Sequence, residues 1–165
     1  PVTTVIQTIT STWQVHFDQK NGGTADEEFT ELESWTRKEN PTVKYFSGTA
    51  VYKTTVAIDS TRLASNKRIF MDLGTVKNIA DISINGVSAG VLWKAPFRIA
   101  DIKPLLKNGD NLLEIKVTNV WRNRMIGDVQ PGEKHPVTAI RRFYKSTDKP
   151  LPSGLLGPVR LIGEL

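Results

Sequence analysis

Hydrophobic and polar residues alternate along most of this chain, and this period-two pattern is typical of β-strands with one buried face. Trp13, Val15 and Phe17 fall on one face of a first such segment. The alternation returns in residues 49–58 and again in residues 68–73. Each segment is short and is followed by Gly, Asn, Asp or Ser, which predicts separate strands joined by turns.

The pattern is clearest in residues 81–121, which contain three β segments and almost no helix signal. Asn85-Gly86 predicts a two-residue hairpin, because a type I′ turn needs a positive φ at both central residues. A second turn is predicted at residues 108–111, and residues 112–118 alternate again. Because no strand–helix–strand repeat is present, we expect an all-β, antiparallel sandwich of about eight strands.

Several segments lack a clear period. Residues 1–10 are rich in β-branched side chains and are either a strand or the tail of a linker. Residues 26–40 are acidic and irregular, residues 41–46 fit one helical turn, and residues 60–66 fit a loop. After Trp121 the chain is loop-like for about thirty residues. A loop of that length is usually functional or packed against another surface.

The 165 residues fit a single domain, residues 1–165. Such a domain buries roughly 70% of its unfolded surface, so it needs neither a metal nor a disulfide to fold. The sequence has no Cys, which excludes disulfides. No apolar run reaches the roughly 20 residues of a membrane span. Because the chain begins with Pro1 rather than Met, we expect a processed product or an excised domain.

The formal net charge is +5, and the local excess of positive charge follows residue 120. The basic side chains there are Arg122, Arg124, Lys134, Arg141, Arg142, Lys145 and Lys149. Nucleic-acid binding is not favoured, since there is neither a dense Lys/Arg run nor a predicted helix to enter a groove. The pattern favours a solvated or anion-facing loop.

Metal-binding and catalytic motifs are sparse. His16 and His135 are far apart in sequence and have no Cys or HExxH motif beside them, so a transition-metal site is not favoured. Residues 108–111 offer oxygen ligands for calcium, but a hairpin turn is the favoured interpretation because the EF-hand spacing is absent. The acidic residues of 26–33 cannot be paired across a sugar ring from sequence, and a solvated acidic loop is favoured.

Three tryptophans lie beside loop or turn residues rather than within strands. Aromatic rings stack on the C–H faces of sugars, and neighbouring polar side chains bond the hydroxyls. The alternative is that these tryptophans cap the core or pack against another domain. The candidate ligand-binding residues are Trp121, Arg122, Asn123, Arg124, Asp128, Trp93 and Trp35.

Residues 48–119 resemble a known family. The segments that carry the resemblance are Tyr52-Lys53-Thr54-Thr55-Val56, Ile69-Phe70-Met71-Asp72-Leu73-Gly74, Ile84-Asn85-Gly86, Pro96-Phe97, Leu106-Lys107-Asn108-Gly109-Asp110-Asn111-Leu112 and Val117-Thr118-Asn119. In order and spacing they resemble the sugar-binding domain of glycoside hydrolase family 2. The fold that this resemblance implies is a galactose-binding-like jelly-roll β-sandwich.

The flanking segments extend the resemblance to nearly the whole chain. They are similar to the C-terminal β-sandwich of large bacterial glycoside hydrolases, including the α-L-rhamnosidases of family 106. These segments are Trp13-Gln14-Val15-His16-Phe17-Asp18, Ser34-Trp35-Thr36, Tyr45-Phe46-Ser47-Gly48-Thr49-Ala50-Val51-Tyr52, residues 118–128 and Ser153-Gly154-Leu155-Leu156-Gly157-Pro158-Val159.

This resemblance implies a non-catalytic accessory domain that is associated with carbohydrate and shares its polypeptide with a catalytic domain. The family's catalytic carboxylates lie on the catalytic barrel, so none is carried over to this chain. Residues 118–128 and the basic loop after them are the expected contact with sugar or with that barrel. The alternatives are a purely structural domain without sugar binding and, third, an autonomous enzyme.

The resemblance also implies where the parent protein works. Such proteins are commonly exported by Bacteroidetes, so we expect a periplasmic or extracellular location. Jelly rolls of this type often hold a structural calcium ion, whose ligands cannot be placed on this sequence.

Overall fold

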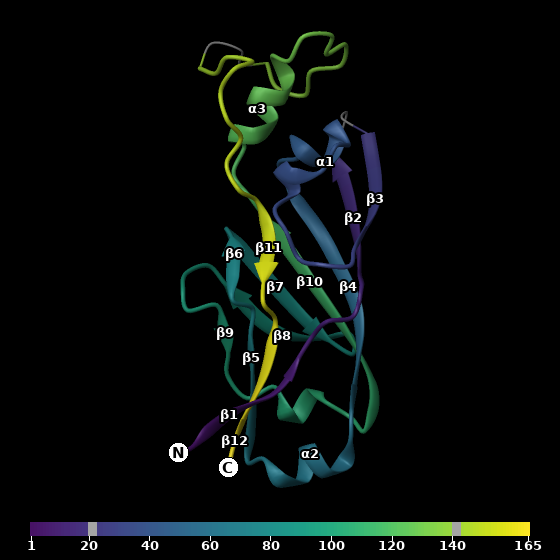
Figure 1. Ribbon diagram of the computed structural model, residues 1–165, viewed down its shortest axis with the longest axis vertical. Helices are drawn as coiled ribbons and strands as arrows, with labels where there is room; N and C mark the ends of the chain where they lie inside the picture. The colour runs from purple at the N-terminus through teal and green to yellow at the C-terminus, as the bar shows by residue number, and fades with distance from the viewer. Residues whose placement is uncertain (20–22, 140–142) are drawn as a thin grey trace.

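The computed structural model describes residues 1–19, 23–139 and 143–165. Strands dominate this part of the chain (Figure 1). They are β1 (Thr3–Thr8), β2 (Trp13–Gln19), β3 (Gly23–Phe29), β4 (Thr49–Ile58), β5 (Arg68–Asp72), β6 (Thr75–Lys77), β7 (Ile79–Ile84), β8 (Val87–Leu92), β9 (Arg98–Ile99), β10 (Gly109–Thr118), β11 (Gly154–Gly157) and β12 (Arg160–Glu164). The helices are η1 (Trp35–Arg37), α1 (Pro41–Lys44), α2 (Ser60–Ser65), η2 (Lys103–Leu105) and α3 (Arg122–Asp128).

The strands form two main sheets that face each other as a sandwich. The larger sheet has the order β3-β2-β4-β10-β7-β8, and the smaller has the order β1-β12-β5-β9. A two-stranded pair, β11-β6, accompanies them. All the strand pairs are antiparallel. The all-β sandwich is therefore confirmed, although the described residues contain more strands than the roughly eight expected, since very short strands leave no alternation to detect.

The core lies between the two sheets and follows the alternation in the sequence. Strand β10 is central: it pairs with β4 on one side and with β7 on the other. Its Leu113, Ile115 and Val117 are buried, and Ile115 pairs with Tyr52 and Ile82, which are buried too. A shift of one residue would turn this whole row toward solvent, so burial fixes the register.

The structure decides between alternatives for several segments. Residues 3–8 form a strand that pairs with β12, rather than a linker. The acidic residues 26–28 lie in β3, a strand at the edge of the larger sheet, where outward-facing carboxylates reach solvent. Residues 60–66, expected as a loop, contain α2, which is capped by the Asp59 carboxylate accepting from Arg62 N–H at 2.8 Å.

The turn predicted at Asn85-Gly86 and the single helical turn are confirmed, whereas residues 109–111, expected in a second turn, belong to strand β10. Asn85 and Gly86 have φ angles of 52° and 80°, the left-handed values that the hairpin requires. Helix α1 fits the helical turn expected near residue 41, with Pro41 in its first turn and the Asn40 side chain as its cap. No helix in the described ranges is both long and apolar enough to cross a membrane.

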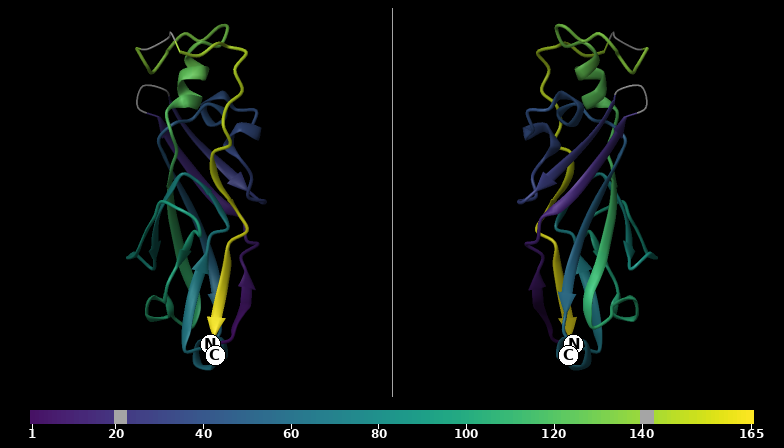
Figure 2. Two further views of the ribbon diagram at one scale, coloured as in Figure 1. Left: turned by 90° about the vertical axis from the view of Figure 1, so that its left-hand side faces the viewer. Right: turned by 90° about the vertical axis from the view of Figure 1, so that its right-hand side faces the viewer.

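The molecule is elongated, with its two termini side by side at one end and α3 at the other (Figures 1 and 2). The termini are joined by a hydrogen bond from Leu165 N–H to the Val2 carbonyl at 3.1 Å. Residues 129–139 and 143–152 lie around α3 at the far end. This arrangement separates the α3 end from the place where further chain would be attached.

Candidate functional site

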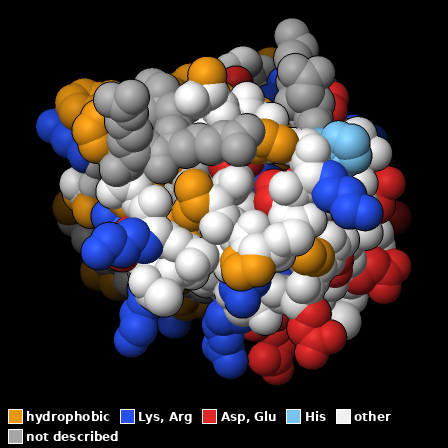
Figure 3. All heavy atoms as spheres, turned by 90° about the horizontal axis from the view of Figure 1, so that it is seen from above, with side chains coloured by type: hydrophobic (Ala, Val, Ile, Leu, Met, Phe, Trp, Pro, Cys, Tyr) orange, Lys and Arg blue, Asp and Glu red, His pale blue; other side chains and the backbone are white. Residues whose placement is uncertain are grey.

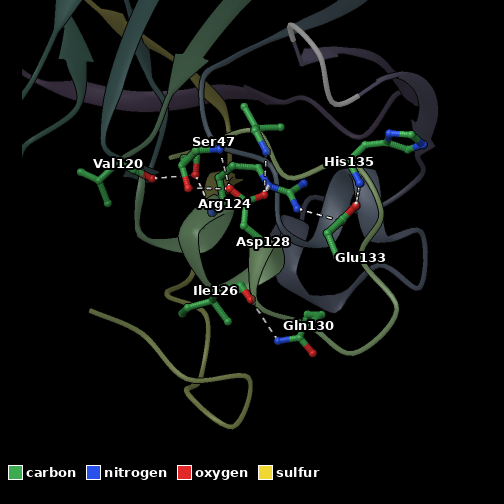
Figure 4. Close-up of polar contacts among 10 residues, drawn as sticks. Ser47, Val120, Arg124, Ile126, Asp128, Gln130, Glu133 and His135 are labelled. Atoms are coloured by element: carbon green, nitrogen blue, oxygen red, sulfur yellow. Dashed lines mark hydrogen bonds and ion pairs between the residues drawn. The ribbon is translucent and has the colours of Figure 1, made fainter. Parts of the chain in front are cut away.

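Five of the seven candidate residues predicted from sequence lie at the α3 end, where the chain leaves the central strand β10. Asn119, just past β10, accepts from Gly48 N–H and donates to the Phe46 carbonyl, both at 2.9 Å. The Ser47 hydroxyl donates to the Val120 carbonyl and accepts from Arg124 N–H, both at 3.0 Å. Trp121, at the N-cap position of α3, makes no side-chain capping bond. Ser47, which is distant in sequence, caps the first turn of α3 instead (Figure 4).

Arg124 and Asp128 form a buried ion pair on α3 (Figure 4). Their Nε–Oδ1 distance is 2.8 Å, and their side chains are 5% and 0% exposed. Arg124 also reaches Glu133 Oε2 at 3.2 Å. Asp128 accepts from the backbone N–H groups of Val137 and Thr138, at 3.0 and 2.7 Å, and from the Thr138 hydroxyl. The pair therefore holds the loop that follows α3 against the helix.

The pKa of Asp128 reflects these contacts. Burial alone would raise it, but the hydrogen bonds from Thr138 and Val137 and the charge of Arg124 outweigh burial. The net result is a pKa below the ordinary value, so this carboxylate stays ionised at neutral pH and serves the fold.

Asn123 holds the returning chain in the same way. Its side-chain amide donates to the Leu151 carbonyl and to the Ser153 hydroxyl, and its oxygen accepts from Leu151 N–H, at 2.8–2.9 Å. Gln130 adds a further tie by donating to the carbonyls of Ile126 and Ser146. Thus Asn123, like the ion pair, is buried and committed to internal bonds rather than presented at the surface.

Trp35 lies in the core rather than at a surface platform. Its side chain is buried, and its ring packs edge to face against Phe17 and Phe46 at 5.3 and 5.4 Å. Its indole N–H donates to the hydroxyl of buried Tyr52, which also accepts from Leu155 N–H. Burial raises the pKa of Tyr52 far above its ordinary value. The structure therefore leaves no face of Trp35 open to a ligand.

Trp121 and Arg122 are the members of the predicted set that face outward at the α3 end. Trp121 is 48% exposed. Arg122 is partly exposed, and its guanidinium lies over the ring of Tyr144 with 4.9 Å to the centroid. We call the exposed apolar side chains of this end the α3 surface: Val120, Trp121, Phe143 and Leu151. Arg141 and Arg142 of the predicted basic loop lie outside the described residues.

The charge at this end is uneven (Figure 3). Acidic side chains gather along one margin, at the lower right of the view, while hydrophobic side chains are scattered among Lys and Arg over much of the rest. Phe143, Tyr144 and Leu151 were not among the predicted site residues. The sequence signal that could have pointed to this group is the pair of adjacent aromatic residues, Phe143-Tyr144, within the basic loop.

Trp93 is the most exposed tryptophan, at 68%, and follows β8 at the edge of the larger sheet. Lys94 Nζ lies 5.1 Å from its ring centroid. Within the described residues, no hydrogen bond, ion pair or ring contact joins Trp93 to α3. The structure thus supports two separate exposed tryptophans rather than one platform.

Asn111, one of the possible oxygen ligands in residues 108–111, is committed to bonds within the chain. The Asn111 side chain is buried, and its oxygen accepts from Lys107 N–H and from the Asn85 amide, both at 2.8 Å. The hairpin turn predicted here is wrong: residues 109–111 lie in strand β10, which pairs with β4 and β7. Among the residues that the structure describes, no group of three or more His, Cys, Asp or Glu side chains could hold a metal. The structural calcium stays a prediction.

Known proteins include relatives that are similar to nearly the whole chain. No protein-family model matches the chain. It is 38% identical, over 93% of its length, to a protein of Formosa agariphila named "Putative beta-glucuronidase". It is also 38% identical to a solved rhamnosidase from Novosphingobium sp. PP1Y, with a TM-score of 0.89 over 99% of the chain. The chain spans 15% of the length of each.

The chain matches a small part of large glycoside hydrolases. More distant structures share only the fold. The β-glucuronidase of Ruminococcus gnavus is 19% identical, with a TM-score of 0.70, and 29% of its length is covered. A β-D-glucuronidase from Dictyoglomus thermophilum is 17% identical, with a TM-score of 0.65 and 28% covered.

Proposed function

We propose that this chain is a non-catalytic, carbohydrate-associated accessory domain of a larger bacterial glycoside hydrolase. In this proposal its α3 surface binds sugar or completes the rim of the catalytic domain in the same polypeptide. The observation that carries the proposal is the 38% identity of nearly the whole chain to a small part of two much larger glycoside hydrolases. The parent enzyme is proposed to act in the periplasm or outside the cell.

The construction of the α3 end supports a contact role. The four exposed apolar side chains of the α3 surface lie on segments at the end opposite the termini. The segments that carry them are held by the buried ion pair of Arg124 with Asp128 and by the side chain of Asn123. A surface held in place before binding loses less conformational entropy when a partner arrives. Trp121 offers an aromatic face of the kind that stacks on sugar C–H groups.

A purely structural role is the second candidate, and one observation favours it. The polar side chains that would bond sugar hydroxyls are those of Asn123, Arg124 and Asp128. They are buried, and their hydrogen bonds are made to other groups of the same chain. In that case the α3 surface packs on the catalytic domain and binds no sugar. Apolar and aromatic side chains are the usual centre of such a protein–protein contact.

Isothermal titration of this chain with galactose, rhamnose and pectin oligosaccharides separates the two roles. Sugar binding at the α3 surface predicts heat that disappears in Trp121→Ala and persists in Trp93→Ala, the matched control at another exposed tryptophan. Circular dichroism should show that both variants keep the fold. Silence across the panel for the folded wild-type chain would favour the structural role.

A further inference from the structure

A recess of about 510 Å³ lies outside the α3 surface. Three segments surround it: the connection between β1 and β2, the residues after β3, and the connection between β11 and β12. None of the residues predicted from sequence to bind a ligand lines it. Its volume falls in the range of small-molecule sites, which are usually about 300–1,000 Å³.

The rim of the recess is rich in hydroxyl groups. Thr8, Thr10, Ser11 and Thr30 contribute side-chain hydroxyls, and Glu31 contributes a carboxylate. All five residues are exposed. Of these side chains, within the part of the chain that the structure describes, only Ser11 has a hydrogen bond, to the Thr54 hydroxyl at 2.8 Å. The other groups are free to donate to or accept from a ligand.

The floor of the recess is apolar and already formed. Trp13 and Val159 are buried beneath it, and Leu32 and Leu156 are half-buried at its sides. A hydrogen bond from Ile9 N–H to the Val159 carbonyl at 2.9 Å ties two of its walls together. An apolar floor below a few polar groups is the usual construction of a small-molecule site.

The charges of the residues that line the recess indicate which class of ligand it can bind. Glu31 is the only charged residue in it, and Lys, Arg and His are absent from this described lining. An anionic ligand would be repelled by the carboxylate without any compensating cation. A single exposed carboxylate also gives a cation little affinity, since exposed ion pairs contribute only about 0–1 kcal/mol. Hydroxyls above an apolar floor instead match a neutral polyhydroxylated ring, which has hydroxyl edges and C–H faces.

We propose that this recess binds a neutral sugar residue, with the Glu31 carboxylate accepting hydrogen bonds from two adjacent hydroxyls and the threonine hydroxyls bonding others. This inference rests on the proposed carbohydrate-associated role. It places a sugar site away from Trp121 and makes uronic acids weaker ligands than neutral sugars.

The test is titration of this chain with methyl α-L-rhamnoside, methyl β-D-galactoside and D-glucuronate. At least one neutral glycoside should bind, and glucuronate should bind at least about tenfold more weakly or not at all. Glu31→Gln should weaken neutral-sugar binding about tenfold, as expected for the loss of one charge-assisted hydrogen bond. Glu39→Gln, an exposed carboxylate outside the recess, should leave binding unchanged. Thr30→Trp should abolish binding by filling the recess.

The outcomes also separate this inference from the accessory role. Binding that is lost in Trp121→Ala but kept in Glu31→Gln would move the sugar to the α3 surface, which overturns the recess and keeps the proposed function. Equal binding of glucuronate, or no binding of either neutral glycoside by the folded chain, would also overturn the recess. The accessory role is judged separately, by whether the isolated chain has hydrolytic activity of its own.

Discussion

Arg124 donates to Asp128 across 2.8 Å, and both side chains are almost completely withdrawn from solvent. The two residues are one turn apart on α3, so the helix itself sets their spacing. Asp128 also accepts hydrogen bonds from the backbone N–H groups of Val137 and Thr138. The ion pair therefore couples α3 to the loop after it. Residues that look like a polar ligand site in the sequence are thus the internal support of the α3 surface.

Removing the charge of Asp128 should therefore destabilise the domain. In Asp128→Asn the buried guanidinium of Arg124 loses the charge of its nearer partner and keeps Glu133, and breaking a buried ion pair typically costs about 3–5 kcal/mol. We expect the free energy of unfolding in urea to fall by about 3 kcal/mol. Asp110→Asn, at an exposed carboxylate, should change it by no more than about 0.5 kcal/mol. Equal stability of the two variants would show that the pair does not support the fold.

The stability of the domain should depend on pH in the acid range. The pKa of Asp128 is lowered in the folded state, and so is that of Glu164, chiefly by its hydrogen bonds from Arg68. A lowered carboxylate pKa gives stability that is present in full above the unfolded-state pKa, about 3.9 for Asp and 4.3 for Glu, and is lost as the pH falls through the folded-state pKa.

Urea unfolding should therefore give a constant free energy near neutral pH and a decreasing one below about pH 4. The slope in that acid range should be smaller in Asp128→Asn, which lacks one of the titrating groups. A wild-type chain that became more stable as the pH fell would reverse the expected sign.

Two glycines with left-handed φ angles offer a matched test of packing. Gly74 has φ +64°, and a Cβ placed there would overlap the backbone carbonyl of Gly157. Gly86 has φ +80°, and a Cβ there would meet nothing within 4 Å. Gly86→Ala should therefore cost only the left-handed strain, about 1–2 kcal/mol. Gly74→Ala should cost clearly more, about 3 kcal/mol or above, because backbone must also move. Equal losses in urea unfolding would argue against the contact between residues 74 and 157.

The strands could be predicted because their burial repeats every second residue. Trp13, Val15 and Phe17 share a buried face as expected, and Asn85 adopts the left-handed conformation of the predicted hairpin. Helix α3 was missed because its seven residues complete only about two turns, too few for a period to be recognised. Strand β3 was taken for a loop because its outward acidic residues carry no apolar period that the sequence could reveal.

The site was predictable only in part, and the reason is the direction of the side chains. Residues 121–128 do form one unit at an exposed end of the molecule. Trp121, however, lies at the N-cap position ahead of the helix and is exposed, whereas Asn123 and Arg124 lie within the helix and are buried. Trp35 was a candidate for ligand binding because it lies beside turn residues, with core packing as the alternative, and its burial and its hydrogen bond to Tyr52 place it in the core.

The most direct test of the accessory role is an activity assay of this chain by itself. Purified chain should be incubated with aryl glycosides of rhamnose, glucuronic acid and galactose, and release of the aryl group should be followed over time. The account predicts release no faster than in buffer, because the catalytic carboxylates are proposed to lie elsewhere in a longer polypeptide. Hydrolysis of any of these glycosides that persists through repurification, at a rate proportional to the amount of chain, would contradict it.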